Sequence, residues 1–165
     1  MAVVEIKKFN EKILRKKCAR VQKIDRGVKD IIIDMAQTME KQNGFGLAAP
    51  QIGISKRIIV VRADFGDRRI LALVNPKITA KSKEIEEMEE GCLSFPGIFL
   101  KIKRHGKVEV EGMDINGKKI SFSADGILAR VFQHEIDHLD GIVFFSRLGF
   151  FKKIKFLLKH PSIKL

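Results

Sequence analysis

Two histidines and a glutamate lie within a five-residue stretch of the C-terminal third, in the order His134-Glu135-Ile136-Asp137-His138. If this stretch is helical, His134 and His138 lie one above the other on the same face, so both imidazoles can reach a single metal ion. Glu135 lies one step around the helix, where its carboxylate can take a proton from a water on that ion without binding the metal. The spacing predicts a metal-dependent hydrolase with Glu135 as general base.

The alternative is a pair of helix histidines that only satisfies hydrogen bonds. Ile127 and Val131 continue, at helical spacing, the stripe that holds both histidines, so the imidazoles are expected to point inward. Two buried imidazoles beside a carboxylate are costly unless a partner satisfies them. We therefore favour a bound metal ion.

Two histidines leave an ion under-coordinated, because a catalytic site needs a third protein ligand and an open position for water. The other candidates are Cys18, Cys92, His105 and His160. Cys18 and the two histidines lie in basic segments with the composition of a surface. Cys92 follows Gly91, where the backbone can approach closely, although a free cysteine is also often a small buried hydrophobe. We expect Cys92 to be the third ligand.

The composition is that of an ordinary globular protein. The 165 residues fall in the size range of one domain, 45% are hydrophobic and 32% are charged. There is no repeat and no apolar run near the ~20 residues that span a bilayer, and residues 1–8 lack a secretory signal. The two cysteines fit free thiols. We expect residues 1–165 to form a single catalytic domain that is cytoplasmic and has no membrane partner.

The net charge of +12 is concentrated at the two ends of the chain. Residues 1–30 hold ten Lys and Arg against four Asp and Glu, and residues 147–165 hold six against none. Each end therefore carries +6, and residues 31–146 sum to zero. Two solvated surfaces that aid solubility would account for this pattern, and so would a polyanionic partner such as RNA.

Three segments have helical spacing. Asp30 precedes a run of apolar residues that predicts an amphipathic helix, which stops near Asn43. A central helix should run over about residues 125–139 and carry both histidines. Residues 149–159 mix phenylalanine, isoleucine and leucine with lysine, which predicts a basic C-terminal helix whose apolar stripe packs against the body.

The rest of the chain reads mainly as strands. Residues 44–51 contain Gly and Pro and cannot continue the first helix, so we expect a loop or a short extended segment. Buried strands are predicted at residues 57–61 and 70–74, separated by a turn at Gly66-Asp67. Residues 107–111 alternate between apolar and polar, as in a strand, and residues 114–117 have the sequence of a hairpin turn. The predicted fold class is α+β, with antiparallel or mixed β-sheets packed around a central metal-binding helix.

Three segments resemble the motifs of the peptide deformylases. Residues 44–51 read GFGLAAPQ, a pair of glycines followed by Leu-Ala-Ala and a glutamine. Residues 90–94 read EGCLS, and residues 133–138 read QHEIDH. The order and spacing of the three segments also fit, and together they bracket most of the chain.

The resemblance implies removal of the formyl group from the N-terminal formylmethionine of newly made proteins. It implies Cys92, His134 and His138 as metal ligands, with Fe2+ as the usual native ion and Zn2+, Ni2+ or Co2+ able to replace it. The partners would be formyl-methionyl nascent polypeptides, bound beside a strand near residues 91–93. Because such substrates emerge at the ribosome, the basic ends have a reason to contact it.

Further site residues follow from the same resemblance. The oxyanion that develops on the formyl group needs donors already in place, and these would be the Gln51 amide and the Leu93 backbone N–H. The alternative for Gln51 is a loop side chain in solvent. Asp137 is expected to be structural and to pair with Arg104. From the residues themselves, Ile127 and Val131 share the helix face of His134, so they could line an apolar slot for the methionine side chain together with Phe45 and the carbon stem of Arg130, although they could instead be core. Gly46 and Gly91 are also expected to bind the substrate.

Two rival functions share some of these features. A metallopeptidase uses the same His-Glu-x-x-His chemistry, but gives no reason for the Cys92 segment or for residues 44–51. Release of formate, rather than cleavage of internal peptide bonds, separates the two enzymes. A non-catalytic, metal-stabilised RNA-binding module would account for the basic ends but leaves Glu135 unused.

Overall fold

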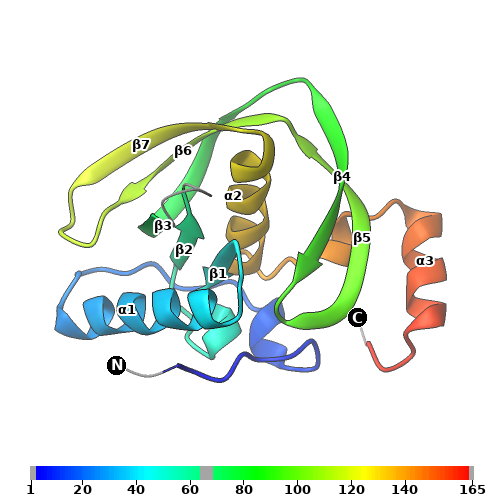
Figure 1. Cartoon of the computed structure of the whole chain (residues 1–165), viewed down its shortest axis with the longest axis horizontal. Coiled ribbons are helices and arrows are strands. Elements are labelled where there is room, and N and C mark those ends of the chain that lie inside the picture. The colour runs from blue at the N-terminus through cyan, green and yellow to red at the C-terminus, as the bar shows by residue number, and fades with distance from the viewer. Residues whose placement is uncertain (1–2, 64–68, 164–165) are drawn as a thin grey trace.

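The computed structural model describes residues 3–63 and 69–163 (Figure 1). The predicted turn at Gly66-Asp67 lies outside these residues. No helix in the described part of the chain is long and apolar enough to cross a membrane. The elements, where η denotes a short 3-10 helix, are η1 (Lys12–Arg15), α1 (Arg26–Lys41), β1 (Gly46–Ala48), η2 (Ala49–Ile52), β2 (Ile58–Arg62), β3 (Ile70–Lys81), β4 (Ile85–Cys92), β5 (Phe95–His105), β6 (Lys107–Met113), β7 (Lys119–Asp125), α2 (Gly126–Leu139), η3 (Phe144–Arg147) and α3 (Phe150–Lys159).

The strands form a five-stranded sheet and a separate hairpin. The sheet has the order β1-β2-β3-β6-β7, the hairpin consists of β4 and β5, and neighbouring strands in both are antiparallel. Helix α2 lies between the sheet and the hairpin, and α3 lies on the opposite side of the hairpin (Figure 1). The predicted α+β fold with a central helix is confirmed, and so is the C-terminal helix.

Helix α1 begins before the predicted start at Asp30. The side chain of Asp25 accepts a hydrogen bond from the backbone N–H of Val28 at 2.9 Å, which makes Asp25 the N-cap. Asp30 lies one turn inside the helix and faces Arg26 at 4.0 Å. The capping side chain of Asp25, rather than the densest apolar run, therefore marks the start of this helix.

The β4–β5 hairpin was not predicted, apart from an extended segment near residues 91–93. Strand β4 contains four glutamates, a residue type that is depleted in strands. The register of the hairpin sets three of these glutamates opposite basic residues of β5, as Glu86–Arg104, Glu87–Lys103 and Glu89–Lys101, an arrangement that favours strand pairing. The pairing depends on a partner distant in sequence, so the local pattern of β4 does not reveal it.

Cys18 is buried, and the surface position expected from its basic neighbours is wrong. Its thiol is 4% exposed and packs in the core cluster that contains Ile136 and Leu139. The segment is extended, so Cys18 faces inward while the neighbouring Lys17 and Ala19 are exposed. Burial raises the pKa of the Cys18 thiol, as expected for an inert core cysteine.

The apolar stripe of α3 does not pack against the body as predicted. Phe156 is the buried residue of this helix, in a cluster with Phe145 of η3. Phe150, Phe151 and Leu158 are instead 72%, 85% and 77% exposed. The helix is therefore anchored by one side, and most of its apolar side chains face solvent.

Candidate metal centre

Cys92, His134 and His138 converge in the structure. His134 and His138 lie one helical turn apart on α2, and Cys92 ends strand β4. One ligand atom from each residue lies within 4.8 Å of the other two. The Sγ atom of Cys92 is 3.3 Å from Nε2 of His138. Among the described residues, neither Cys18, His105 nor His160 joins this group.

The three side chains fit a divalent metal ion. One thiol and two imidazoles are a donor set that zinc and other first-row ions accept. A glutamate accepts a hydrogen bond from His134 Nδ1, which leaves Nε2 of His134 available to bind the ion. Metal-bound histidines are commonly oriented in this way by a carboxylate on their other ring nitrogen. Three protein ligands leave room for a water, as a catalytic ion requires.

Glu135 lies beside this group in a dry environment. The residue is 4% exposed, and its Oε2 atom has no hydrogen-bond partner among the described residues. Burial raises the pKa of Glu135 to about 7, although His134 and Arg104 act in the opposite direction. A cation on the neighbouring ligands favours the ionised carboxylate, which is the form that accepts a proton.

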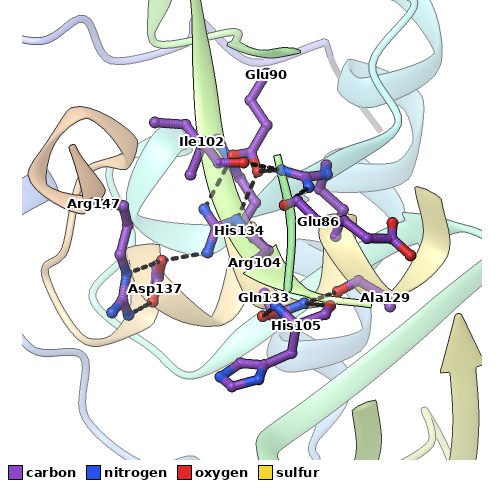
Figure 2. Close-up of polar contacts among 11 residues, drawn as sticks. Glu86, Glu90, Ile102, Arg104, His105, Ala129, Gln133, His134, Asp137 and Arg147 are labelled. Atoms are coloured by element: carbon purple, nitrogen blue, oxygen red, sulfur yellow. Dashed lines mark hydrogen bonds and ion pairs between the residues drawn. The ribbon is translucent and has the colours of Figure 1, made fainter. Parts of the chain in front are cut away.

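The glutamate that orients His134 is Glu90, which Figure 2 shows in a buried network of charged side chains. Its carboxylate accepts hydrogen bonds from Arg104 Nε at 2.7 Å and Arg130 Nη1 at 2.6 Å, and contacts His134 Nδ1 at 3.0 Å. Burial raises the pKa of Glu90, but the hydrogen bonds of His134 and Arg104 outweigh it and lower the pKa to about 2. Glu90 is therefore ionised and fixes the orientation of the His134 ring.

Arg130 was predicted to contribute its carbon stem to a methionine pocket, but its guanidinium also forms hydrogen bonds with the hairpin. Besides Glu90, it donates to the backbone oxygens of Ile102 at 2.9 Å and Glu86 at 2.9 Å. It therefore ties both strands of the hairpin to α2. Sequence reasoning missed this clamp and the role of Glu90, although Glu90 stands directly beside Gly91 and Cys92 in the second motif.

Asp137 points away from the three ligands, and its predicted pairing with Arg104 is confirmed. Its carboxylate accepts a hydrogen bond from Arg104 Nη1 at 2.8 Å (Figure 2). Arg147, at the end of η3, contacts both carboxylate oxygens and was not predicted. Asp137 thus joins α2 to β5 and to η3.

Gln51 is buried beside Cys92, so a loop side chain in solvent is excluded. Its Oε1 accepts the backbone N–H of Ala48 at 2.8 Å, and its Nε2 lies 3.2 Å from Ser94 Oγ and 3.6 Å from Cys92 Sγ. The amide is therefore held with its donor side toward the metal ligands.

A pocket of about 670 Å³ opens beside the three ligands. Phe45 and Ile127 are 50% and 46% exposed and lie at its rim, so they are not core residues, whereas Val131 is buried. Met88 and Phe99 of the hairpin add apolar surface. The lining includes every residue predicted to bind substrate or to act in catalysis, namely Phe45, Gly46, Gln51, Gly91, Leu93, Ile127, Arg130, Val131 and Glu135.

We predict that Asp137→Asn lowers the free energy of unfolding by about 2 kcal/mol, because the buried guanidinium of Arg104 loses a charged partner. Asp140→Asn is the matched control, since its pair with Arg57 is partly exposed and should contribute less. Urea denaturation measures both. An unchanged denaturation midpoint in Asp137→Asn, together with a loss of bound metal, would show that Asp137 acts on the ligands instead.

Comparisons with known proteins agree with this geometry. The family model described as polypeptide deformylase matches residues 3–153. The chain is 43% identical over 166 residues to the peptide deformylase of Thermodesulfovibrio yellowstonii, which covers 99% of this chain and 100% of the relative. It is 45% identical to peptide deformylase 1 of Clostridium perfringens, over 87% of this chain and 97% of the relative.

Solved structures give the same result. The peptide deformylase of Thermus thermophilus superposes with a TM-score of 0.91 at 40% identity, covering 97% of this chain and 94% of that one. The peptide deformylase of Synechococcus elongatus in complex with actinonin has a TM-score of 0.90 at 38% identity, over 98% and 89% of the two chains. The chain therefore belongs to the polypeptide deformylase family, metal-dependent enzymes that remove the formyl group from the N-terminal formylmethionine of new proteins.

Proposed function

We propose that this chain deformylates N-terminal formylmethionine with a divalent ion held by Cys92, His134 and His138. The observation that carries the proposal is the approach of these three ligand atoms to within 4.8 Å, at the wall of a pocket that also contains Glu135. Formate release from a formyl-methionyl peptide by anaerobically purified protein tests it. Cleavage of internal peptide bonds without formate would favour a metallopeptidase.

We propose Fe2+ as the native ion, with Zn2+, Ni2+ or Co2+ able to replace it. The support is the donor set, since a thiolate and two imidazoles accept several first-row ions. When bound, the ion activates water and polarises the formyl carbonyl.

In this proposal Glu135 moves the protons. It takes a proton from the attacking water and returns one to the leaving amine. Its free Oε2 atom and its burial support this role, because a dry carboxylate without a partner can accept a hydrogen bond from water. Glu90 stays ionised and holds His134, so it takes no part in proton transfer.

Gln51 and Leu93 are the proposed donors to the oxyanion. The Nε2 atom of Gln51 is already oriented by the bonds that its amide makes to Ala48 and Ser94, so little reorganisation is needed during the reaction. Leu93 lines the same pocket, directly after Cys92.

The methionine side chain is proposed to enter the apolar part of the pocket. Phe45, Ile127 and Val131 form this part together with the stem of Arg130. The substrate backbone would lie beside Gly91, at the end of β4. The pocket is open at Phe45 and Ile127, so only the first residue of a long peptide needs to be enclosed while the rest of the peptide extends into solvent.

We also propose that the basic ends bring the enzyme to the ribosome, where its substrates emerge. The support is the +6 charge at each end, beside a neutral body. Contacts of lysine with RNA phosphates release counterions, so they make binding depend on salt.

Cys92→Ala should lose most of the bound metal and the activity. Cys18→Ala should retain both, because Cys18 lies in the core and is not one of the three proposed ligands. Metal analysis and formate release measure the two effects. Full metal occupancy in Cys92→Ala would refute the assignment of the third ligand.

Glu135→Ala should still bind the ion but release formate at least ~10²-fold more slowly, the usual contribution of a positioned acid or base. An empty metal site in this variant would mean that Glu135 is needed for binding.

Gly46→Ala tests the placement of Glu135 without removing it. A Cβ atom at Gly46 would lie 2.5 Å from Glu135 Oε1 and 2.8 Å from Val131 Cγ1, so the carboxylate must move. We expect formate release to fall by about 10²-fold while the metal remains bound. Gly149→Ala is the matched control, since nothing lies within 4 Å of its Cβ position. Equal activity of the two variants would contradict the proposed role of this close approach.

Replacing Lys152, Lys153, Lys155 and Lys159 by Gln should weaken ribosome binding and flatten its salt dependence, by roughly 0.7–0.9 in the log–log slope per lysine that contacts phosphate. Turnover of a short free peptide should stay nearly unchanged. If the affinity for the ribosome responds neither to salt nor to these substitutions, the lysines do not contact RNA and serve only solubility.

A further inference from the structure

The outer face of α3 carries an apolar stripe, which we define as Phe150, Phe151, Ile154 and Leu158. Phe150, Ile154 and Leu158 follow one another at i, i+4 spacing, so they lie one above the other, and Phe151 lies beside them. All four are exposed, by 42% at Ile154 and by 72% or more at the others. A contiguous exposed apolar patch of this kind marks an interaction surface.

A row of lysines borders this stripe. Lys155 and Lys159 lie one turn apart on the flank next to Phe151 and Leu158, and Lys152 lies beyond them. All three lysines are exposed. On the face of α3 opposite the stripe, Phe156 is buried and packs against Phe145, which holds the helix to the body. The helix is thus fixed to the body with its stripe and lysines outward.

The cationic surface continues onto the hairpin. A hollow of about 270 Å³ lies between the N-terminal end of α3 and the hairpin, with Phe150 and Phe151 in its wall. Its charged residues are four cations and one acid, namely Lys101, Lys103, Arg147, Lys152 and Glu87. Lys152 is paired with Glu87 at 2.9 Å and Arg147 with Asp137, so Lys101 and Lys103 supply the remaining positive charge of the hollow.

Contrary to the expectation from the sequence that the protein has no membrane partner, we propose that α3 and the adjoining side of the hairpin form a docking surface for an anionic phospholipid bilayer. Short helices with an apolar stripe bordered by lysines lie in the membrane interface, with the stripe among the acyl chains and the lysines at the phosphates. A helix of ten residues cannot span a bilayer and would lie along it. The hollow would receive a phosphate headgroup between its cations.

Other occupants fit the face less well. A second copy of the chain would bring two rows of lysines together, which is repulsive. RNA phosphates would engage the lysines but leave the exposed phenylalanines in water, so binding to the ribosome does not account for the stripe. Because both partners would use the lysines of α3, docking of this helix to the bilayer and to the ribosome would exclude each other.

Docking through this face leaves the substrate pocket free. Glu87, Lys101 and Lys103 line the hollow on the side of α3, whereas Met88 and Phe99 line the pocket. Figure 1 shows α3 and α2 on opposite sides of the hairpin. The enzyme could therefore act on a chain that emerges close to a membrane.

Flotation with lipid vesicles tests the proposal on the full chain. Partition onto an equal mixture of phosphatidylcholine and phosphatidylglycerol should exceed that onto phosphatidylcholine alone by about 10²-fold, since each of three lysines contributes about fivefold. Phe151→Ser should lower partition onto the anionic vesicles by at least about tenfold, because the variant lacks the phenyl ring that would be buried among the acyl chains. Ribosome binding and turnover of a free peptide should not change in this variant.

Two matched controls distinguish the effect of the stripe on partition from that of any exposed apolar side chain or any surface cation. Ile85→Ser removes an apolar side chain that is 49% exposed and lies outside the stripe, and Lys118→Gln removes a cation between β6 and β7. Neither should alter partition. Equal partition onto both vesicles, or unchanged partition in Phe151→Ser, would overturn the proposal. So would a dimer that dissociates on Phe151→Ser, or loss of ribosome binding in that variant, because either result assigns the stripe to another occupant.

Discussion

The buried carboxylate of Glu90 joins the two elements that carry the three proposed metal ligands. Cys92 lies on the hairpin and both histidines lie on α2, so the ligand set exists only if these elements keep a fixed distance. Glu90 binds Arg104 of β5 together with Arg130 and His134 of α2. A two-stranded hairpin is marginal by itself, and these contacts add to the apolar packing that holds it.

Burial of so many charges is tolerated because each has a partner of opposite sign. Arg104 lies between Glu90 and Asp137, and Asp137 also receives Arg147. Removing one member would leave another charge buried without compensation, which costs more than the pair gains. The same network separates the tasks of two glutamates near His134. Glu90 is held ionised by its donors, whereas Glu135 is buried and one of its oxygens has no hydrogen-bond partner among the described residues.

Much of the fold and site could be predicted because the signals are local. The i, i+4 histidines predict α2, and the turn at residues 114–117 predicts the β6–β7 hairpin, which the structure contains. The sequence could not reveal β4, because glutamates are depleted in strands and the basic residues that face them lie on β5. Nor could it place Cys18, since inward orientation depends on the path of the neighbouring chain. The stripe of α3 has the same pattern whether it faces the body or solvent, so only the packing of Phe156 decides its direction.

The central claim is that one ion on Cys92, His134 and His138 drives deformylation. Its most direct test is formate release from a formyl-methionyl peptide by metal-stripped protein, titrated anaerobically with ferrous iron. The account predicts that stripped protein is inactive and that activity rises linearly until one ion is bound per chain. Formate release at the full rate without metal, or saturation that does not coincide with binding of a single ion, would contradict it.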